Sequence, residues 1–197
     1  MSLIINFLTL FSGLDRAYGV FNTTGEVTDK GKAKGKAFTK QGTVSAQLWD
    51  DHLSGKQRLG IVPIKDSSEC LFGAIDIDEY QINIEKICQV IENLKLPLVP
   101  CRSKSGGLHC YIFCKEPIPA EIIRDKLADM ASSLGFAGVE IFPKQDKLAS
   151  PEDVGNWINM PYFDHERTMT YGIKNGKPLS TEDFITYAHL QAVSMDD

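Results

Sequence analysis

The 197-residue chain lacks several features that would place a protein in a class at once. Its apolar stretch near the start, from Leu3 to Phe11, is interrupted by Asn6 and Thr9 and is too short to span a bilayer. The basic start and small-residue cleavage site of a signal peptide are also missing. There is no internal repeat and no low-complexity tract. We therefore expect a globular protein with no membrane partner.

Metal-binding cysteine pairs are absent too. The five cysteines form an odd set without a Cys-x-x-Cys pair, which argues against a zinc ribbon and against a disulfide framework. We expect free thiols and a cytoplasmic location. The four histidines are never two residues apart, which excludes the His-hydrophobe-His metal pair of a rolling-circle initiator.

Acidic residues outnumber basic residues in the chain. The chain has 21 Lys and Arg against 26 Asp and Glu, for a formal net charge of −5. This balance argues on average against a nucleic-acid binder, whose footprint is usually basic. Residues 31–49, however, contain four lysines and no acid, and a local positive surface is enough to bind phosphate. A solvated loop would show the same composition. The candidates to follow a template backbone are Lys32, Lys34, Lys36 and Lys40.

The spacing of apolar residues predicts an α/β fold of the α+β kind. Helices are expected over 3–11, 44–52, 84–94 and 119–134 and from Ser180, and a mobile basic loop over 25–40. Strands are expected over 59–64, 71–78, 98–102, 108–114 and 139–142. The resulting order from residue 59, β-β-α-β-β-α-β, favours an RRM-like, mixed or largely antiparallel sheet with helices on one face.

We expect one domain across residues 1–197. Within it, an N-terminal α/β lobe with the basic loop covers about 1–58. An RRM-like lobe covers about 59–175, and a C-terminal helix occupies 176–197.

Two aspartates occupy alternate positions of a strand-like run. Residues two apart in a strand share a face and lie roughly 6.5–7 Å apart. Ile75 and Ile77 are therefore expected to point into the core, with Asp76 and Asp78 on the other side. Such a pair suits hard divalent cations, because Mg²⁺ prefers carboxylate oxygens and keeps positions open for phosphates. A strand end with two solvated acids would give the same pattern.

Glu140 repeats this arrangement between Val139 and Ile141. An acid in the middle of a short apolar strand is unusual, although an edge strand can carry one to discourage aggregation. The sequence thus offers a third carboxylate on a second strand.

Residues 101–113 combine a basic, glycine-containing loop with a strand that carries a histidine. Glycines let backbone amides turn toward an anion, and nearby cations and hydroxyls add further donors. His109 shares a strand face with Tyr111 and Phe113 and is expected just beyond the loop. An ordinary hairpin with a polar face is the alternative for this segment taken alone. The loop consists of Arg102, Ser103, Lys104, Ser105, Gly106 and Gly107.

Together these segments predict a site for metal and triphosphate. Three carboxylates and a cationic loop on neighbouring strands are what nucleotidyl or phosphoryl transfer with two metal ions requires.

In this order and spacing, the motifs resemble the archaeo-eukaryotic primase superfamily. Its pattern is an acid-hydrophobe-acid strand (here 76–78), a Ser-x-His strand after a small basic loop (here 103–109), and a later hydrophobe-acid strand (here 139–140). The loop variant, with segments 142–145 and 155–161, is similar to primase-polymerases of mobile elements and defence systems. The resemblance covers roughly residues 10–172, and its N-terminal segments are the less specific.

The resemblance implies template-dependent nucleotidyl transfer by a primase or DNA polymerase. It implies two Mg²⁺ or Mn²⁺ ions held by Asp76, Asp78 and Glu140, dNTP or NTP substrates, and a DNA or RNA template with its primer. Many relatives insert a cysteine-rich zinc module that this chain lacks, so a zinc module or helicase is expected elsewhere in a parent protein. The implied nucleotide-binding residues are Lys104, Ser105, Gly106, Gly107, His109, Lys144 and Asn156.

Two other classes remain open at this point. A metal-dependent nuclease of the restriction type needs a Glu-x-Lys strand, whereas Glu140 is followed by Ile141 and Phe142. A non-catalytic RRM-like nucleic-acid binder could stack bases on Tyr111 and Phe113. The three acids argue against that binder, because they would repel phosphate without a metal.

Overall fold

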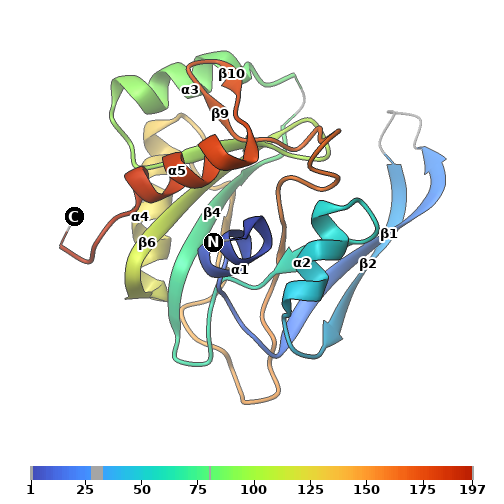
Figure 1. Cartoon of the computed structure of the whole chain (residues 1–197). Coiled ribbons are helices and arrows are strands. Elements are labelled where there is room, and N and C mark those ends of the chain that lie inside the picture. The colour runs from blue at the N-terminus through green and yellow to red at the C-terminus, as the bar shows by residue number, and fades with distance from the viewer. Residues whose placement is uncertain (1, 28–32, 80, 197) are drawn as a thin grey trace.

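A computed structural model describes residues 2–27, 33–79 and 81–196 of the chain. These residues form five helices and ten strands, arranged around two four-stranded antiparallel sheets and a short hairpin (Figure 1). Within them, no helix is long and apolar enough to cross a bilayer.

The first sheet has the strand order β2-β1-β3-β8. Helices α1 and α2 precede β1 and β3 respectively in the chain, and both contribute to the core on one side of this sheet. Its last strand, β8, lies about 100 residues after β3 in the sequence. The first sheet therefore includes two strands, β3 and β8, that lie after residue 57. The elements are α1 (Leu3–Leu10), β1 (Ala17–Val27), β2 (Ala33–Gln41), α2 (Ala46–Leu53), β3 (Arg58–Ile61) and β8 (Ile158–Asn159).

The prediction of a mobile loop over 25–40 is wrong for most of that segment. β1 and β2 pair as a long antiparallel hairpin, with a register irregularity between Thr23 and Val27. The alternation of lysine with glycine, alanine and threonine hides the strand, because β2 is an edge strand whose residues 35–40 are exposed and have no need of apolar side chains.

The second sheet has the order β5-β6-β4-β7. The sequence places residues 59–64 in this sheet, but the structure pairs Arg58–Ile61 with β1 and β8 of the first sheet instead. The elements after β3 are β4 (Glu69–Ile77), α3 (Ile84–Asn93), β5 (Val99–Arg102), β6 (Leu108–Pro119), α4 (Ala120–Ser133), β7 (Glu140–Phe142), β9 (Ile173–Lys174), β10 (Lys177–Pro178) and α5 (Thr181–Gln191).

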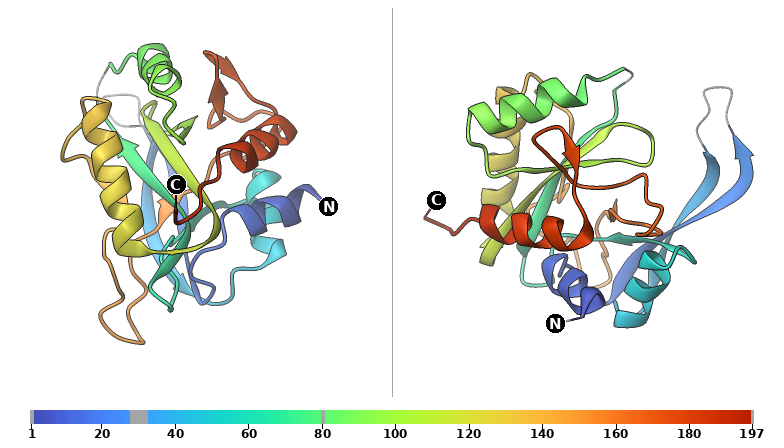
Figure 2. Two further views of the ribbon diagram at one scale, coloured as in Figure 1. Left: turned by 90° about the vertical axis from the view of Figure 1, so that its left-hand side faces the viewer. Right: turned by 45° about the horizontal axis from the view of Figure 1, so that its top comes forward.

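The second sheet is covered on both faces, which corrects the prediction of helices on one face only. Figure 2 shows α3 and α4 on one side of it and α1 and α5 on the other. Ile75 and Ile77 are fully buried toward α3 and α4, whereas Phe72 and Ala74 belong to the opposite core.

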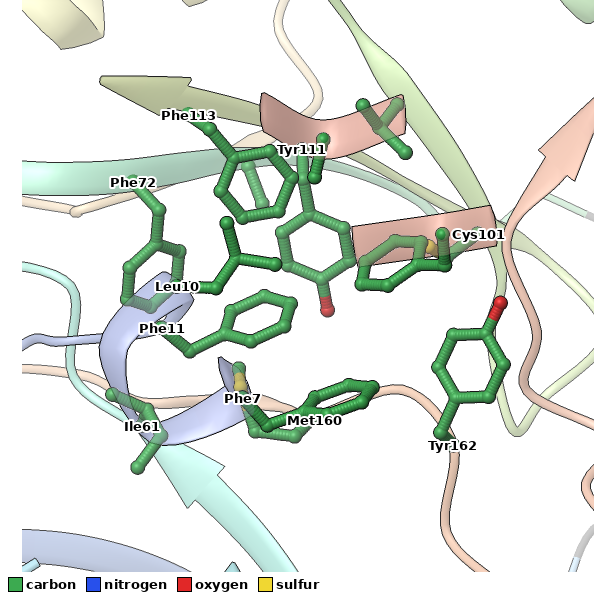
Figure 3. Packing of buried hydrophobic residues seen from close by; sticks show 14 of the residues in the cluster. Phe7, Leu10, Phe11, Ile61, Phe72, Cys101, Tyr111, Phe113, Met160 and Tyr162 are labelled. Atoms are coloured by element: carbon green, nitrogen blue, oxygen red, sulfur yellow. The ribbon is translucent and has the colours of Figure 1, made fainter. Parts of the chain in front are cut away.

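An aromatic core joins the two sheets to α1, α2 and α5 (Figure 3). At its centre Phe11 stacks on Trp49, with ring centroids 5.7 Å apart, and meets Tyr111 edge-on at 5.2 Å. Edge-to-face and offset-stacked rings stabilise each other beyond their buried area. This core fixes how the first sheet sits against the face of β4 and β6, and so it positions the polar residues at the end of that face.

Candidate active site

The central feature of the site is a row of three polar residues across three strands. On β4, Asp76 lies directly opposite His109 of β6 on one side and opposite Glu140 of β7 on the other. Residues in register across antiparallel strands project from the same face. The fold therefore brings together two of the predicted carboxylates and the predicted histidine.

This row lies at the open end of a face that is otherwise buried. Along β4, Phe72 and Ala74 precede Asp76 on the same side and are fully buried in the aromatic core. The Asp76 side chain retains 23% exposure and that of His109 11%. The face of the second sheet that carries the carboxylates is therefore buried along most of its length. It is accessible to solvent only at the end where Asp76, Asp78 and Glu140 lie.

Each of the three carboxylates has a different partner. Nε2 of His109 lies 3.4 Å from Oδ1 of Asp76, and the Ser105 hydroxyl donates to Oδ1 of Asp78 at 2.8 Å. The Lys144 ammonium donates to Oε1 of Glu140 at 2.9 Å. Within residues 2–27, 33–79 and 81–196, no cluster of three or more His, Cys, Asp and Glu side chains is arranged to hold a metal ion.

Tyr111 orients the ring of His109. The Tyr111 hydroxyl donates to the carbonyl oxygen of Asn159 at 3.0 Å and lies 3.2 Å from Nδ1 of His109. This contact leaves Nε2 of the ring directed toward Asp76. Burial lowers the pKa of His109 to about 4, against the opposing effect of the Asp78 charge.

The loop between β5 and β6 packs against the end of β4. A Cβ atom on Gly107 would lie 2.3 Å from the carbonyl oxygen of Ile77, so only glycine allows this approach. Gly106 has a φ of +88°, and its amide donates to the Ser103 carbonyl at 3.1 Å. The Gly106 amide thus closes the turn of the loop, and the contact with an anion stays a prediction. The Ser103 and Ser105 hydroxyls lie 3.0 Å apart beside Asp78.

Lys104 lies close enough to His109 for its charge to lower the pKa of that histidine, whereas Asn156 and the predicted lysines of β2 lie on other segments. The Lys104 ammonium is 3.0 Å from the ring centroid of Phe21, so it connects this loop to β1 of the first sheet. Asn156 is exposed in the segment before β8. Lys36 and Lys40 are exposed on β2, and Lys34 lies on the same strand, while Lys32 falls outside the described residues.

Sequence reasoning missed a pocket that the two sheets form beside His109. Arg58 is half-buried there, with its guanidinium 4.1 Å from the ring centroid of Phe163, and burial lowers its pKa. No local pattern identifies this arginine, because it reaches the pocket only through the pairing of β3 with β1 and β8. The lining residues are Arg58, Cys101, Arg102, Ser103, Lys104, His109, Asn159, Met160, Pro161 and Thr170.

The row, the loop and this pocket all lie in a region that matches one family model. Residues 18–175 match the archaeo-eukaryotic primase domain of the TOTE conflict system. The chain belongs to this family. The superfamily and the defence-associated branch indicated by the motifs are both confirmed, and the matched region of this primase domain contains Asp76, Asp78, His109 and Glu140.

Two solved structures are similar to this chain at low sequence identity. The crystal structure of primase RepB' shares 9% identity and has a TM-score of 0.42, covering 96% of this chain and 62% of that chain. The catalytic domain of primase Repb' in complex with initiator DNA shares 9% identity with a TM-score of 0.43, covering 96% of this chain and 93% of that one. This chain thus spans less than two thirds of the first of these two. A search of curated proteins gave no match.

Proposed function

We propose that this primase domain joins nucleotides on a nucleic-acid template, taking them from dNTPs or NTPs, with two Mg²⁺ or Mn²⁺ ions at Asp76, Asp78 and Glu140. The observation that carries the proposal is the row of His109, Asp76 and Glu140 in register across three strands. A non-catalytic binder would gain nothing from two acids in register, because carboxylates without a metal repel the phosphates of nucleic acid.

The donor set fits the proposed cations. Carboxylate oxygens are the ligands that Mg²⁺ and Mn²⁺ prefer, and the two exposed acids, Asp78 and Glu140, flank the half-buried Asp76. When bound, two such ions offset the charge of the triphosphate and of the attacking 3′-oxygen. Until then the Lys144 ammonium offsets the charge of Glu140, and the Ser105 hydroxyl holds the carboxylate of Asp78 in place.

The triphosphate would lie between this row and the pocket beside His109. Arg58, Arg102 and Lys104 bring three cationic side chains to the pocket, and Ser103 and Ser105 bring hydroxyl donors to its edge. Guanidinium groups and hydroxyls are well suited to phosphate oxygens. Gly106 and Gly107 stay candidates for contact with the triphosphate through their backbone amides, and Gly107 also lets the loop approach β4. Lys144 adjoins the site through Glu140.

Template binding would involve the hairpin of β1 and β2, called the basic hairpin because of the lysines on β2. Lys36 and Lys40 are exposed on β2 in a stretch of the chain without acids, and Lys32 and Lys34 belong to the same stretch. Their charge supports contact with the phosphate backbone of DNA or RNA. Asn156 stays a candidate for a contact near the nucleotide.

Primer extension with dNTPs and with NTPs, in Mg²⁺ and in Mn²⁺, tests the proposal. Asp76→Asn keeps the size of the side chain and removes its charge, so we expect at least a hundredfold loss of extension. Asp129→Asn, an exposed aspartate on α4, is the matched control and should extend normally. Equal extension by Asp76→Asn and the unaltered protein would contradict the assignment. Degradation of labelled DNA with metal alone would instead indicate a nuclease.

A further inference from the structure

The indole of Trp157 lies flat on the backbone of the first sheet. A Cβ atom on Gly19 of β1 would be 2.0 Å from Cδ2 of this ring, and one on Gly60 of β3 would be 2.2 Å from its Cε3. The indole Nε1 donates to the Thr39 hydroxyl of β2 at 3.1 Å. The side chain therefore extends from the residue before β8 across β3 and β1 to β2, and two glycines make room for it.

This support leaves the ring partly accessible. Trp157 is half-buried, whereas Trp49 in the aromatic core is fully buried. The strands cover one face of the Trp157 indole, and the side chain also packs against the core that contains Ile75 and Ile77, so a ligand can reach only the part of the ring that stays exposed. The hydrogen bond to Thr39 fixes the ring in its plane. An aromatic ring that is held on one side and accessible elsewhere is a preorganised stacking surface.

Trp157 shares its side of the sheet with residues of the proposed nucleotide site. Gly60 pairs with Asn159 and with Gly19, while Arg58 pairs with Phe21, so all these positions face the same way. Arg58 and Asn159 line the pocket beside His109, and the Lys104 ammonium lies over Phe21. The indole thus belongs to the face of the first sheet that meets the loop between β5 and β6.

We propose that Trp157 is a stacking platform for a nucleobase. The inference rests on the proposed function, because it assigns the base-binding part of the site whose triphosphate-binding part is described above. Every nucleobase has a π-face, so stacking on an indole tolerates any sequence, as a templated polymerase requires. The base belongs either to the incoming nucleotide or to a single-stranded nucleic acid, and the two sources can be told apart.

Tryptophan fluorescence provides the direct test. A Trp49→Phe variant keeps Trp157 as its only tryptophan, and it removes a buried indole N–H that has no hydrogen-bond partner among the described residues. We titrate this variant with a single-stranded oligonucleotide and, separately, with dATP and Mg²⁺. Tripolyphosphate with Mg²⁺ and an abasic oligonucleotide serve as base-free probes. Quenching by a base-bearing ligand and not by its base-free counterpart supports stacking, and the ligand that quenches identifies the source of the base.

Several outcomes would overturn the proposal. The absence of quenching by both base-bearing ligands does so, whether they bind elsewhere or fail to bind. Equal quenching by the base-free probes does so as well, since it would report charge and not stacking. Primer extension separates this failure from a failure of the proposed function: extension without quenching overturns the stacking role alone, and loss of both overturns nucleotidyl transfer as well. Conversely, Asp76→Asn is expected to lose extension and to keep the quenching by the oligonucleotide.

Substitution of Trp157 gives an independent measurement. Trp157→Phe retains an aromatic face and should bind base-bearing ligands within about twofold of the unaltered protein. Trp157→Leu retains apolar bulk without a π-face and should weaken them about tenfold, in line with the measured range for base–aromatic stacking. Its affinity for tripolyphosphate should not change. Equal affinities of the Phe and Leu variants for base-bearing ligands would contradict stacking. If the Leu variant does not fold, the fluorescence result decides alone.

Discussion

Glu140 lies directly opposite Asp76 across the β4–β7 ladder, while its carboxylate accepts a hydrogen bond from Lys144, four residues later in its own segment. The backbone thus places the two acids in register, and Glu140, a proposed ligand of a divalent cation, is paired with a lysine. Binding of a divalent cation at Glu140 must compete with this ammonium.

Removal of Lys144 is therefore expected to strengthen metal binding. The pair is partly exposed, with 37% and 61% of the two side chains accessible, and such pairs contribute about 0.2–1 kcal/mol. Lys144→Gln should lower the dissociation constant for Mn²⁺, measured calorimetrically without nucleotide, by about two- to fivefold. Lys147→Gln, at an exposed lysine nearby, should leave that constant unchanged. Weaker Mn²⁺ binding by Lys144→Gln would contradict this view.

Tyr111→Phe tests how His109 is held. The substitution removes the hydroxyl that contacts Nδ1 of His109 and donates to the Asn159 carbonyl. Loss of the partner of these two groups costs about 1–3 kcal/mol of stability. We expect KM for the nucleotide to rise severalfold with a smaller change in kcat. Tyr162→Phe is the matched control, because its hydroxyl is equally engaged, donating to the Leu179 carbonyl and accepting from the Gly172 amide. That variant should lose stability and keep KM. Identical kinetics for both would refute the role of Tyr111.

The pocket beside His109 gives a third prediction. If Arg58 contacts phosphate, Arg58→Gln should raise KM for dNTPs about tenfold, since charge-assisted hydrogen bonds contribute about 1.5–3 kcal/mol. Arg58→Lys should recover part of this loss, because it restores the charge without the planar fork. Inhibition by free tripolyphosphate should weaken in parallel. An unchanged KM in Arg58→Gln would remove this arginine from the site.

The stability of the fold should fall with acid because of a histidine away from the site. His52 accepts from the Leu59 amide through Nδ1 at 3.0 Å and donates to the Pro161 carbonyl through Nε2 at 2.8 Å. Burial lowers its pKa to about 4 from the ordinary 6.5. The unfolded chain thus takes up a proton first as the pH falls. This contribution is complete above pH 6.5 and is lost progressively between pH 6.5 and 4.

Urea unfolding at pH 7.5 and pH 5 measures this effect. The depressed pKa of His52 alone should lower the free energy of unfolding by about 2 kcal/mol between these values. His52→Gln should be less stable at pH 7.5 and should show a smaller difference between the two pH values. His189→Gln, at an exposed histidine of α5, should behave like the unaltered protein. If His52→Gln kept the full acid sensitivity, the sensitivity would have another origin.

The basic hairpin predicts a salt effect on nucleic-acid binding. The slope of log K against log salt for a single strand changes by about 0.7 for each phosphate contact. Lys36→Gln with Lys40→Gln should therefore reduce the slope by about 1.4, as followed by fluorescence anisotropy of a labelled oligonucleotide. The pair Lys95→Gln and Lys177→Gln, both exposed and outside β2, should leave the slope unchanged. Equal slopes in all proteins would exclude the hairpin from the interface.

The local sequence pattern was sufficient to predict much of the second sheet. The alternation around Ile75 and Ile77 and the glycine turn before His109 predict β4 and β6 closely, and Ser180 begins the last helix by accepting from the Asp183 amide, as the sequence suggests. These features depend on residues close in the chain, where period and turn chemistry are informative.

Features that depend on distant pairing were not predictable. The register of Glu140 with Asp76, the contact of Lys104 with Phe21 and the entry of Arg58 into the pocket all require strands to meet that are far apart in sequence. The strand β2 was not predicted from the sequence for a different reason. As an exposed edge strand it has no apolar alternation to detect.

The position of β8 has a consequence for how the chain is made. β8 closes one edge of a sheet whose other three strands all precede residue 62, and the whole of the second sheet is encoded in between. During synthesis β1, β2 and β3 leave the ribosome long before this edge can be covered. Since closure of so long an intervening segment is slow, we expect the first sheet to mature only when the second has formed.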